Sequence, residues 1–359
     1  MKVDDFAKSH QCTFYDPIKV GGGNISRRLF STKVVILLAL LALVPILQSC
    51  GSPKPFRETR FLMGTLVEIV AYPDTPRVRK SVGHAFKRMT DIEALAGPHS
   101  DTSPLALLRE GKKVNLPEDL RRILQVALDT ARRSSGAFDP TMGKVIRLWG
   151  FDGDNPGIPS PAELDAAMKT VGYARLKMGS GGEAASTGPV WIDLGGVAKG
   201  YAVDAAVHVL EKEGVKAGIV NAGGDLRAFG KRPGRKTWRI GIQDPDKPQG
   251  MAGVLDLVDG SVATSGDYER YFTVDGVRYH HILDPKTGRP ARSGLRSTTV
   301  ITSDCVLADA LATAAFVLGP EKGLDLLERM PDVEGVLIAG GGRILKTSGT
   351  GSVVRFEKR

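Results

Sequence analysis

Asp309 and Thr313 stand four residues apart in the segment DCVLADALATAA, residues 304–315. On a helix this spacing puts both side chains on one face. A carboxylate and a hydroxyl are hard oxygen ligands of the kind that Mg²⁺ accepts beside substrate phosphates. The flanking alanines leave room for a ligand to come close. A helix cap or a surface pair explains the same two residues equally simply, so the spacing alone leaves both interpretations open.

A second segment with chemical potential is DLGGVAKGYAVD, Asp193 to Asp204. It matches neither G-x-x-x-x-G-K-[ST] nor G-x-G-x-x-G, the two familiar phosphate loops. Glycines nevertheless allow a ligand close to the backbone, and a following helix offers unpaired N–H groups to an anion. Lys199 would add a positive charge. A tight strand-to-helix turn with a solvated lysine is the competing interpretation.

The third segment is VRYHHILDPKTGRP, with His280 and His281 side by side. In an extended chain they point to opposite faces, so only one enters a given site, as a general base or as a neutral donor to a phosphate. Zinc is disfavoured because no further His or Cys cluster accompanies the pair. NAGGD (221–225) and ATSGDYERY (263–271) are glycine loops that either present backbone amides to a ligand or form hairpin turns.

The elements that must position these residues form a mixed pattern. Alternating apolar residues predict strands, helical periodicity predicts helices, and no strict βαβ alternation links them. We therefore expect an α+β fold with a mostly antiparallel sheet and packed helices, in one compact unit. Strands are predicted over residues 59–72, 216–230, 235–245, 253–274 and 335–349, helices over 78–97, 117–134, 160–172, 201–214, 305–319 and 321–330, and a structured loop over 136–154.

Composition and the N-terminus bound the function further. The 359 residues carry a net charge of +9 without a long basic run, which favours a cationic surface over nucleic-acid binding. NISRRLFSTK precedes VVILLALLALVPIL and then LQSC, the pattern of an export signal ending in a lipobox. We expect residues 1–49 to be the signal with a long leader, Cys50 to be lipidated, and 50–58 to be a tether. Export would use the Sec route or, through SRRLF, the twin-arginine route. The chain would then be anchored to a bacterial membrane, facing the periplasm or outer side, with Cys305 as its sole thiol.

Seven motifs in order, FLMGT, GAFDPTMG, DLGGVAKGYAVD, NAGGD, ATSGDY, HHILDPKTG and ADALATA, resemble the ApbE family of FAD:protein FMN transferases over residues 59–359. The resemblance implies a T-fold-like catalytic domain that binds FAD, with Mg²⁺ on its pyrophosphate. It implies transfer of FMN to a threonine hydroxyl of an acceptor protein, with release of AMP. The implied acceptors are flavin subunits of redox-driven ion pumps or electron-transfer complexes that carry a D-[GS]-x-T-[GS]-A-like motif.

The same resemblance implies roles for individual residues. Asp309, Thr313 and the backbone carbonyl of Gly196 fall on metal ligands. His281 is the candidate base for the threonine proton, with Asp284 and Asp267 as lesser candidates. Flavin-nucleotide contacts fall on Met63, Asp139, Lys199, His281 and Ile282.

One segment departs from the family pattern, because His99 replaces a tyrosine and Arg109 an asparagine. Two other functions stay open at this point, an FAD pyrophosphatase that gives FMN and AMP, and a lipid-anchored flavin-binding protein without turnover.

Overall fold

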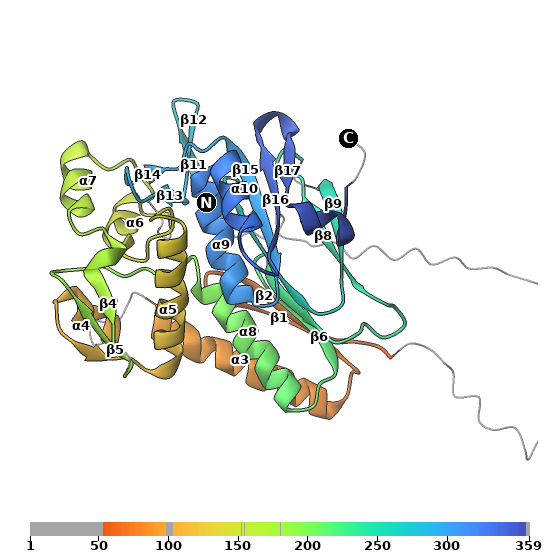
Figure 1. The fold of residues 1–359 in the computed structure, drawn as a ribbon. Helices are drawn as coiled ribbons and strands as arrows, with labels where there is room; N and C mark the ends of the chain where they lie inside the picture. The colour runs from red at the N-terminus through yellow and green to blue at the C-terminus, as the bar shows by residue number, and fades with distance from the viewer. Residues whose placement is uncertain are drawn as a thin grey trace, which may run out of the picture.

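The computed structural model describes residues 53–97, 103–151, 153, 155–179, 181–247 and 249–356 (Figure 1). The expected export signal, Cys50 and His99 lie outside these residues, so their predictions stay predictions. Within the described ranges no helix is both long and apolar enough to cross a bilayer.

The framework is a sheet of eight strands in the order β1-β2-β6-β7-β10-β15-β16-β17, and every neighbouring pair is antiparallel. The predicted mostly antiparallel sheet is therefore confirmed. The strands are β1 (Phe56–Leu62), β2 (Thr65–Tyr72), β6 (Ala217–Ala222), β7 (Asp225–Phe229), β10 (Gly260–Gly266), β15 (Leu295–Thr302), β16 (Glu334–Ala339) and β17 (Ile344–Lys346).

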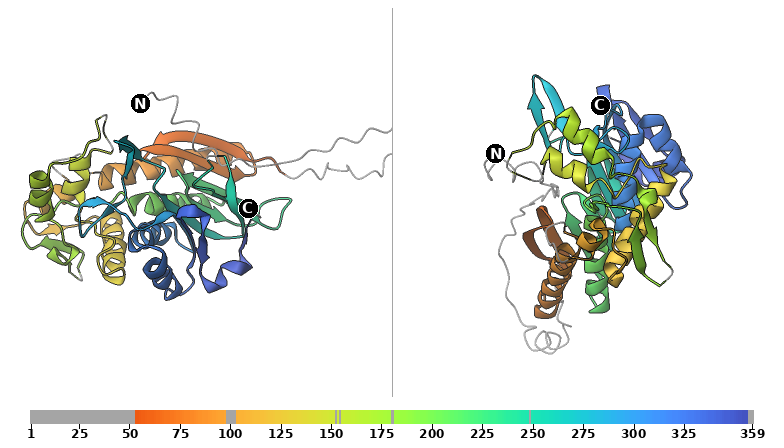
Figure 2. Two further views of the ribbon diagram at one scale, coloured as in Figure 1. Left: turned by 90° about the horizontal axis from the view of Figure 1, so that it is seen from above. Right: turned by 90° about the vertical axis from the view of Figure 1, so that its left-hand side faces the viewer.

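Each face of this sheet buries a separate core, because successive side chains of a strand point to opposite faces. Ile69 on β2 packs into the larger core, whereas its neighbour Val70 packs into the smaller one. Helices cover the first face: α3 (Pro76–Ala96), α5 (Glu118–Arg133), α8 (Ala198–Lys212), α9 (Cys305–Leu318) and α10 (Pro320–Glu328) (Figures 1 and 2). A three-stranded sheet covers the second: β8 (Trp238–Gln243), β9 (Met251–Leu257) and β18 (Val354–Phe356).

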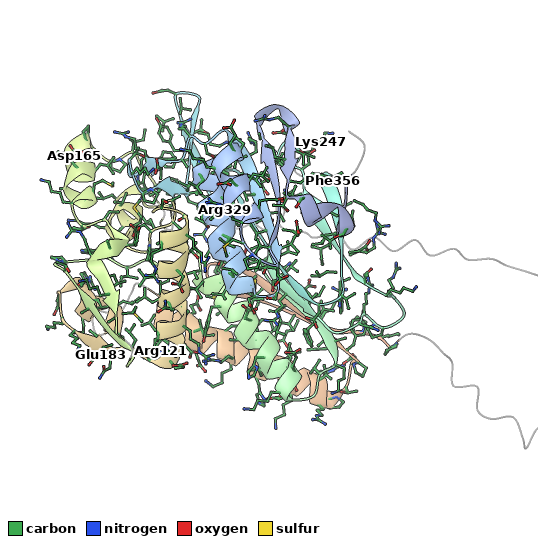
Figure 3. The ribbon with its side chains drawn as sticks, viewed as in Figure 1. Arg121, Asp165, Glu183, Lys247, Arg329 and Phe356 are labelled. Atoms are coloured by element: carbon green, nitrogen blue, oxygen red, sulfur yellow. The ribbon has the colours of Figure 1, made fainter. Side chains whose placement is uncertain are left out.

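The remaining elements form a lobe at the side of the helical layer (Figure 1). It contains α4 (Pro104–Arg109), α6 (Gly143–Trp149), α7 (Pro161–Met168) and a small sheet of β3 (Val114–Asn115), β4 (Leu176–Met178) and β5 (Glu183–Ser186). Asp165 on α7 lies at the left of the view, in the lobe, and Lys247, which follows β8, lies to the right of it on the other side of the helical layer (Figure 3).

Two short hairpins connect the sheet to the lobe. They are β11 (Tyr271–Val274) with β12 (Val277–His280), and β13 (Leu283–Asp284) with β14 (Arg289–Pro290). Three 3-10 turns complete the described chain, at Tyr173–Arg175, Gly340–Gly342 and Ser348–Ser352.

Most predicted elements are present, but some predictions need correction. Residues 59–72 were predicted as a strand and instead belong to a hairpin of two strands, β1 and β2. The segment 136–154 was predicted to be loop, but it contains α6. Helix α4 and the small sheet were not predicted at all. Helix α8 begins at Ala198 rather than at residue 201, so Lys199 belongs to its first turn and not to the loop before it.

Candidate active site

Helix α9 presents Asp309 and Thr313 toward the glycine loop, as their spacing predicted. Asp309 is only 3% exposed, and its Oδ2 accepts a hydrogen bond of 3.1 Å from the backbone N–H of Gly200. Thr313 Oγ1 lies 3.2 Å from Ser265 Oγ on β10. The free N–H at the start of α8 is thus used by a protein carboxylate, and the two oxygen-bearing side chains are fixed from two different elements.

Glycine is required where the loop meets α9. A Cβ on Gly200 would lie 2.3 Å from the carbonyl oxygen of Cys305, so helices α8 and α9 cross here too closely for any side chain. A Cβ on Gly196 would lie 3.0 Å from the ring of Phe138 and 3.4 Å from Thr313 Oγ1. The glycine loop therefore sits directly over the face of α9 that carries Thr313.

The last residue of DLGGVAKGYAVD caps α9. Asp204 Oδ1 accepts from the backbone N–H of Cys305 at 3.1 Å, and Oδ2 accepts from that of Val306 at 2.9 Å. Asp304, the residue at the N-cap position, makes no such side-chain bond. One stretch of sequence thus supplies both the loop above Thr313 and the cap of the helix on which Thr313 lies.

Lys199 is not a solvated surface lysine. Its Nζ lies 3.0 Å from Asp225 Oδ2, 3.5 Å from Asp309 Oδ1 and 3.2 Å from the carbonyl oxygen of Gly195. Burial opposes the charged ammonium, but the attraction of the two carboxylates outweighs it and raises the pKa of Lys199. The side chain therefore carries a positive charge in the site.

The acidic groups around this lysine include two that the sequence did not single out. Burial, followed by repulsion from Asp309, raises the pKa of Asp225 to about 7. Burial and the charge of Asp225 raise the pKa of Glu269 to about 8, and burial also raises the pKa of Asp309. NAGGD and ATSGDYERY were considered only as sources of backbone amides. Their carboxylates, Asp225 and Glu269, are what the structure brings to Lys199.

The donors predicted for Mg²⁺ fit that ion by chemical type. A carboxylate on Asp309, a hydroxyl on Thr313 and the backbone carbonyl of Gly196 are all hard oxygen donors, which Mg²⁺ prefers. They lie on two segments in direct contact. Among the described residues no cluster of three or more His, Cys, Asp and Glu side chains suits a metal ion.

His280 and His281 point to different surroundings, as expected for neighbours in an extended segment. His280 is buried, with Nε2 3.0 Å from the carbonyl oxygen of Ala291. His281 places Nδ1 3.3 Å from the carbonyl oxygen of Arg270. Burial and Arg270 lower the pKa of His281 to about 3, and Lys199 contributes to that shift. His281 is thus a neutral imidazole, and Nδ1–H donation to Arg270 leaves Nε2 free of its proton.

The other predicted nucleotide contacts lie on separate segments. Met63 occupies the β1–β2 turn with a positive φ of 54°, and its N–H donates to Glu93. Ile282 is buried directly after His281. Asp139 already accepts three hydrogen bonds, two from Thr141 and one from the N–H of Tyr173, so both its oxygens hold the local loop.

The two lesser candidate bases have structural partners. Asp267 Oδ1 lies 3.3 Å from Arg296 Nε and 3.5 Å from Arg278. Asp284 Oδ1 accepts the N–H of Lys286 within a turn. Neither carboxylate has the surroundings of His281, where an unprotonated nitrogen remains.

The family model for the ApbE family matches residues 63–337 of this chain. The chain belongs to the ApbE family. An FAD:protein FMN transferase of Treponema pallidum is 33% identical and aligns with 86% of this chain and 91% of its own. That of Escherichia coli K12 is 34% identical, with 83% and 90% covered.

Solved ApbE structures share the fold. The ApbE protein of Thermotoga maritima superposes with a TM-score of 0.78 at 35% identity, covering 85% of this chain and all of that one. The flavin transferase ApbE of Vibrio cholerae superposes with a TM-score of 0.74 at 26% identity, covering 84% and 99%. The expected ApbE-like α+β fold and the expectation of a transferase are confirmed.

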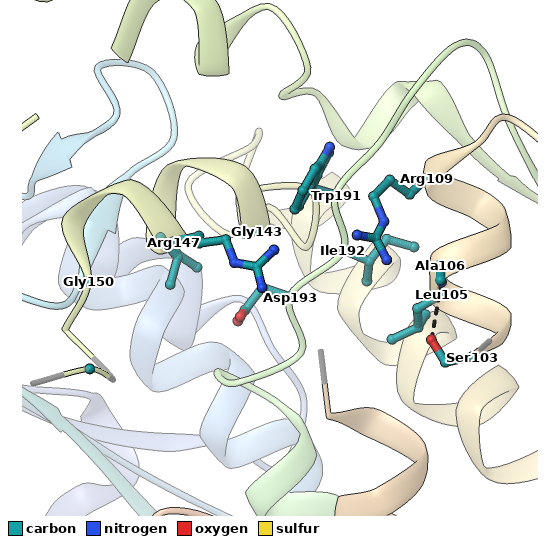
Figure 4. Close-up of a pocket in the computed structure, with 12 residues that line it drawn as sticks. Ser103, Leu105, Ala106, Arg109, Gly143, Arg147, Gly150, Trp191, Ile192 and Asp193 are labelled. Atoms are coloured by element: carbon teal, nitrogen blue, oxygen red, sulfur yellow. Dashed lines mark hydrogen bonds between the residues drawn. The ribbon is translucent and has the colours of Figure 1, made fainter. Parts of the chain in front are cut away.

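Beside the glycine loop, this ApbE chain has a pocket of about 300 Å³ between α4, α6 and residues 191–193 (Figure 4). Trp191 lies in its wall, with the guanidinium of Arg109 4.7 Å and that of Arg147 5.5 Å from the ring centre. Arg109 is one of the two residues that depart from the family pattern. It therefore faces a pocket next to Asp193, the first residue of the glycine loop.

Proposed function

We propose that this protein transfers FMN from FAD to a threonine hydroxyl of an acceptor protein and releases AMP, in a reaction that depends on Mg²⁺. The observation that carries the proposal is the face made by Gly196, Asp309 and Thr313, with the buried ammonium of Lys199 beside it. Hard oxygen donors can hold Mg²⁺, and both this ion and a fixed positive charge would attract a pyrophosphate. The names of the relatives support the same reaction.

The proposed reaction forms one oxygen–phosphorus bond and breaks another. The threonine oxygen attacks the phosphorus on the FMN side of the pyrophosphate, the P–O bond to the AMP phosphate breaks, and AMP leaves. The candidate acceptor of the hydroxyl proton is His281 Nε2, which carries no proton in the neutral ring. The pKa of about 3 makes this nitrogen a weak base in the free protein, and the negative charge of a bound pyrophosphate would raise that pKa. Bound Mg²⁺ supplies electrostatic stabilisation of the pyrophosphate oxygens.

The protein residues have distinct tasks in this scheme. Lys199 holds a positive charge near the phosphates without a proton being lost, because Asp225 and Asp309 keep it charged. Asp309 is held in place by the N–H of Gly200. The pocket at Trp191 offers room next to the loop for part of the dinucleotide.

The test is the purified protein with FAD, Mg²⁺ and a flavin-free acceptor, followed by in-gel flavin fluorescence and AMP release. We expect a fluorescent acceptor band that Asp309→Ala abolishes, while the exposed-helix control Asp165→Asn keeps it. AMP without acceptor labelling would identify an FAD pyrophosphatase, and neither product would identify a flavin-binding protein. Near-normal labelling by the Asp309 variant would remove this site from the proposal.

We also propose an exported, lipid-anchored protein, with residues 1–49 removed, Cys50 lipidated, 50–58 as tether and 59–359 as the transferase domain. The apolar run ending in LQSC supports this, and the family match to residues 63–337 fits the domain boundary. The partner would be an acceptor flavoprotein subunit of a redox-driven complex with a D-[GS]-x-T-[GS]-A-like motif. Incorporation of labelled lipid at Cys50 tests the anchor.

A further inference from the structure

Asp225, at the start of β7, has a buried carboxylate oxygen with an incomplete set of partners. The residue is 3% exposed, and no hydrogen-bond donor among the described residues is aligned on its Oδ2. The cation at this oxygen is the ammonium of Lys199, which lies 3.0 Å away and forms an ion pair with it. Burying an ion pair usually costs more than the attraction of its two charges returns, so this pairing calls for an explanation beyond packing.

Lys199 lies between two carboxylates, those of Asp309 and Asp225, which we expect to have different roles. Asp309 is a proposed metal ligand and lies 3.5 Å from the ammonium, while Asp225 is closer. A divalent cation on Asp309 would repel an ammonium at that distance, because charges of the same sign interact strongly in a buried site. The lysine must then move toward another anion or leave the site.

We propose that Asp225 is a positioning residue that holds Lys199 clear of the metal-binding side of Asp309 and keeps the ammonium beside the phosphates. This inference rests on the proposed function. It assigns to Asp225 an effect on metal binding that operates through Lys199. A direct ligand role for the open oxygen of Asp225 is the alternative, and it predicts a different result.

The test is a double-mutant cycle on the full chain, with Mg²⁺ affinity measured calorimetrically in the absence of FAD. The four proteins are the wild type, Asp225→Asn, Lys199→Met and the double variant. We expect Asp225→Asn to weaken Mg²⁺ binding by roughly tenfold when Lys199 is present, because the released ammonium then competes for Asp309. In the Lys199→Met background the same change should have an effect at least about fivefold smaller.

An equal loss in both backgrounds would overturn the inference and make Asp225 a direct contributor to the metal site. No loss in either would overturn it as well. Absence of Mg²⁺ binding by the wild type would overturn both this inference and the metal dependence of the proposed function, so the two failures are distinguishable. Asp256→Asn is the matched control, because Asp256 also pairs with a cation, Arg355, but lies on β9 in the small sheet on the opposite face of the main sheet. It should leave Mg²⁺ affinity unchanged.

Folding of each variant is checked by denaturant unfolding without metal. If Asp225→Asn does not fold, Asp225→Ala takes its place in the cycle. A loss of Mg²⁺ affinity that appears only when Lys199 is present supports the inference, and an equal loss in both backgrounds contradicts it.

Discussion

At the scale of single residues, the site gathers ionisable groups that are buried or partly buried. Lys199, Asp225, Glu269 and Asp309 interact with one another inside the protein. Burying charges usually costs more than their attraction returns, and apolar residues of similar size would pack there at lower cost. Perturbed titration of this kind is typical of functional sites, and here it coincides with the predicted metal and phosphate residues.

His280 makes a prediction about pH, because its surroundings differ from those of His281. Burial lowers the pKa of His280 to about 4, against about 6.5 in an unfolded chain. Its contribution to stability is therefore complete above pH of about 6.5 and is lost as the pH falls toward 4, by up to about 3 kcal/mol. His280→Phe, measured by denaturant unfolding between pH 7.5 and 4.5, should reduce this acid-induced loss.

In His280→Phe the acid-induced loss of stability should become smaller without disappearing, since burial also lowers the pKa of His281. The control is His84→Phe, because His84 lies on exposed α3 surface with Glu213 as its partner. An acid-induced loss that is as large in His280→Phe as in the wild type would show that His280 is not its source.

At the scale of elements, the segments that the sequence predicted well are those with a periodic pattern and local end signals. Helix α9 follows from its helical periodicity, and the four-residue spacing of Asp309 and Thr313 puts both on one face of it. Helix α6 was missed because it has only seven residues and lies in a segment, residues 136–154, that is rich in glycine and aromatic residues. It is held by a long-range contact, in which the N–H of Gly143 donates to the carbonyl oxygen of Trp191. No local pattern encodes that contact.

The candidate site shows the same limit. Gly196, Asp309 and Thr313 were predictable from the loop, the helix spacing and the resemblance. Asp225 and Glu269 were not, because their importance depends on burial against Lys199, a partner that follows from the three-dimensional arrangement of β7, α8 and the segment after β10. The sequence around an acidic residue at the end of a strand does not indicate whether that residue is buried.

The cap of α9 gives a prediction for the coupling between α8 and α9. Asp204→Ala removes two hydrogen bonds to the start of α9 and leaves the partly buried Arg227 without its closest acid, which lies 2.8 Å away. Loss of a cap together with a charged hydrogen bond should cost about 2–4 kcal/mol. Urea unfolding measures this loss. Hydrogen exchange should show faster opening of the first turn of α9.

Asp204→Asn serves as the matched variant, because it keeps one acceptor and the shape of the side chain. We expect a smaller loss than for alanine, about 1 kcal/mol. If alanine costs no more than the distant surface change Asp165→Ala, the cap is not what fixes the start of α9.

At the scale of the whole molecule, the site lies where three parts meet. The helical layer contributes Lys199 and Asp309, the sheet contributes Asp225, and the lobe leads through Trp191 into the glycine loop. His281 enters from the segment between the two hairpins. Activity therefore depends on how firmly the lobe and this segment are joined, and not only on the two cores at the sheet.

Trp149 on α6 is one residue that connects the lobe to this segment. It is fully buried, its Nε1–H donates to the carbonyl oxygen of Gly288 at 2.8 Å, and its ring lies 5.8 Å from that of Tyr279 on β12. Trp149→Phe keeps an aromatic ring but leaves a buried carbonyl without its donor, at a cost of about 1–3 kcal/mol. Hydrogen exchange should become faster in residues 283–290, while β2 and β6 stay protected.

Trp238 provides a control with the same chemistry on the opposite face of the sheet, because its Nε1–H donates to the carbonyl oxygen of Gly230, also at 2.8 Å. Trp238→Phe should lower global stability to a similar extent and leave exchange in residues 283–290 unchanged relative to the rest. If both variants accelerate exchange there equally, the lobe and the site segment are coupled through global stability and not through Trp149. Faster local exchange in Trp149→Phe alone, accompanied by slower FMN transfer, would place this hydrogen bond among the contacts that keep His281 in position.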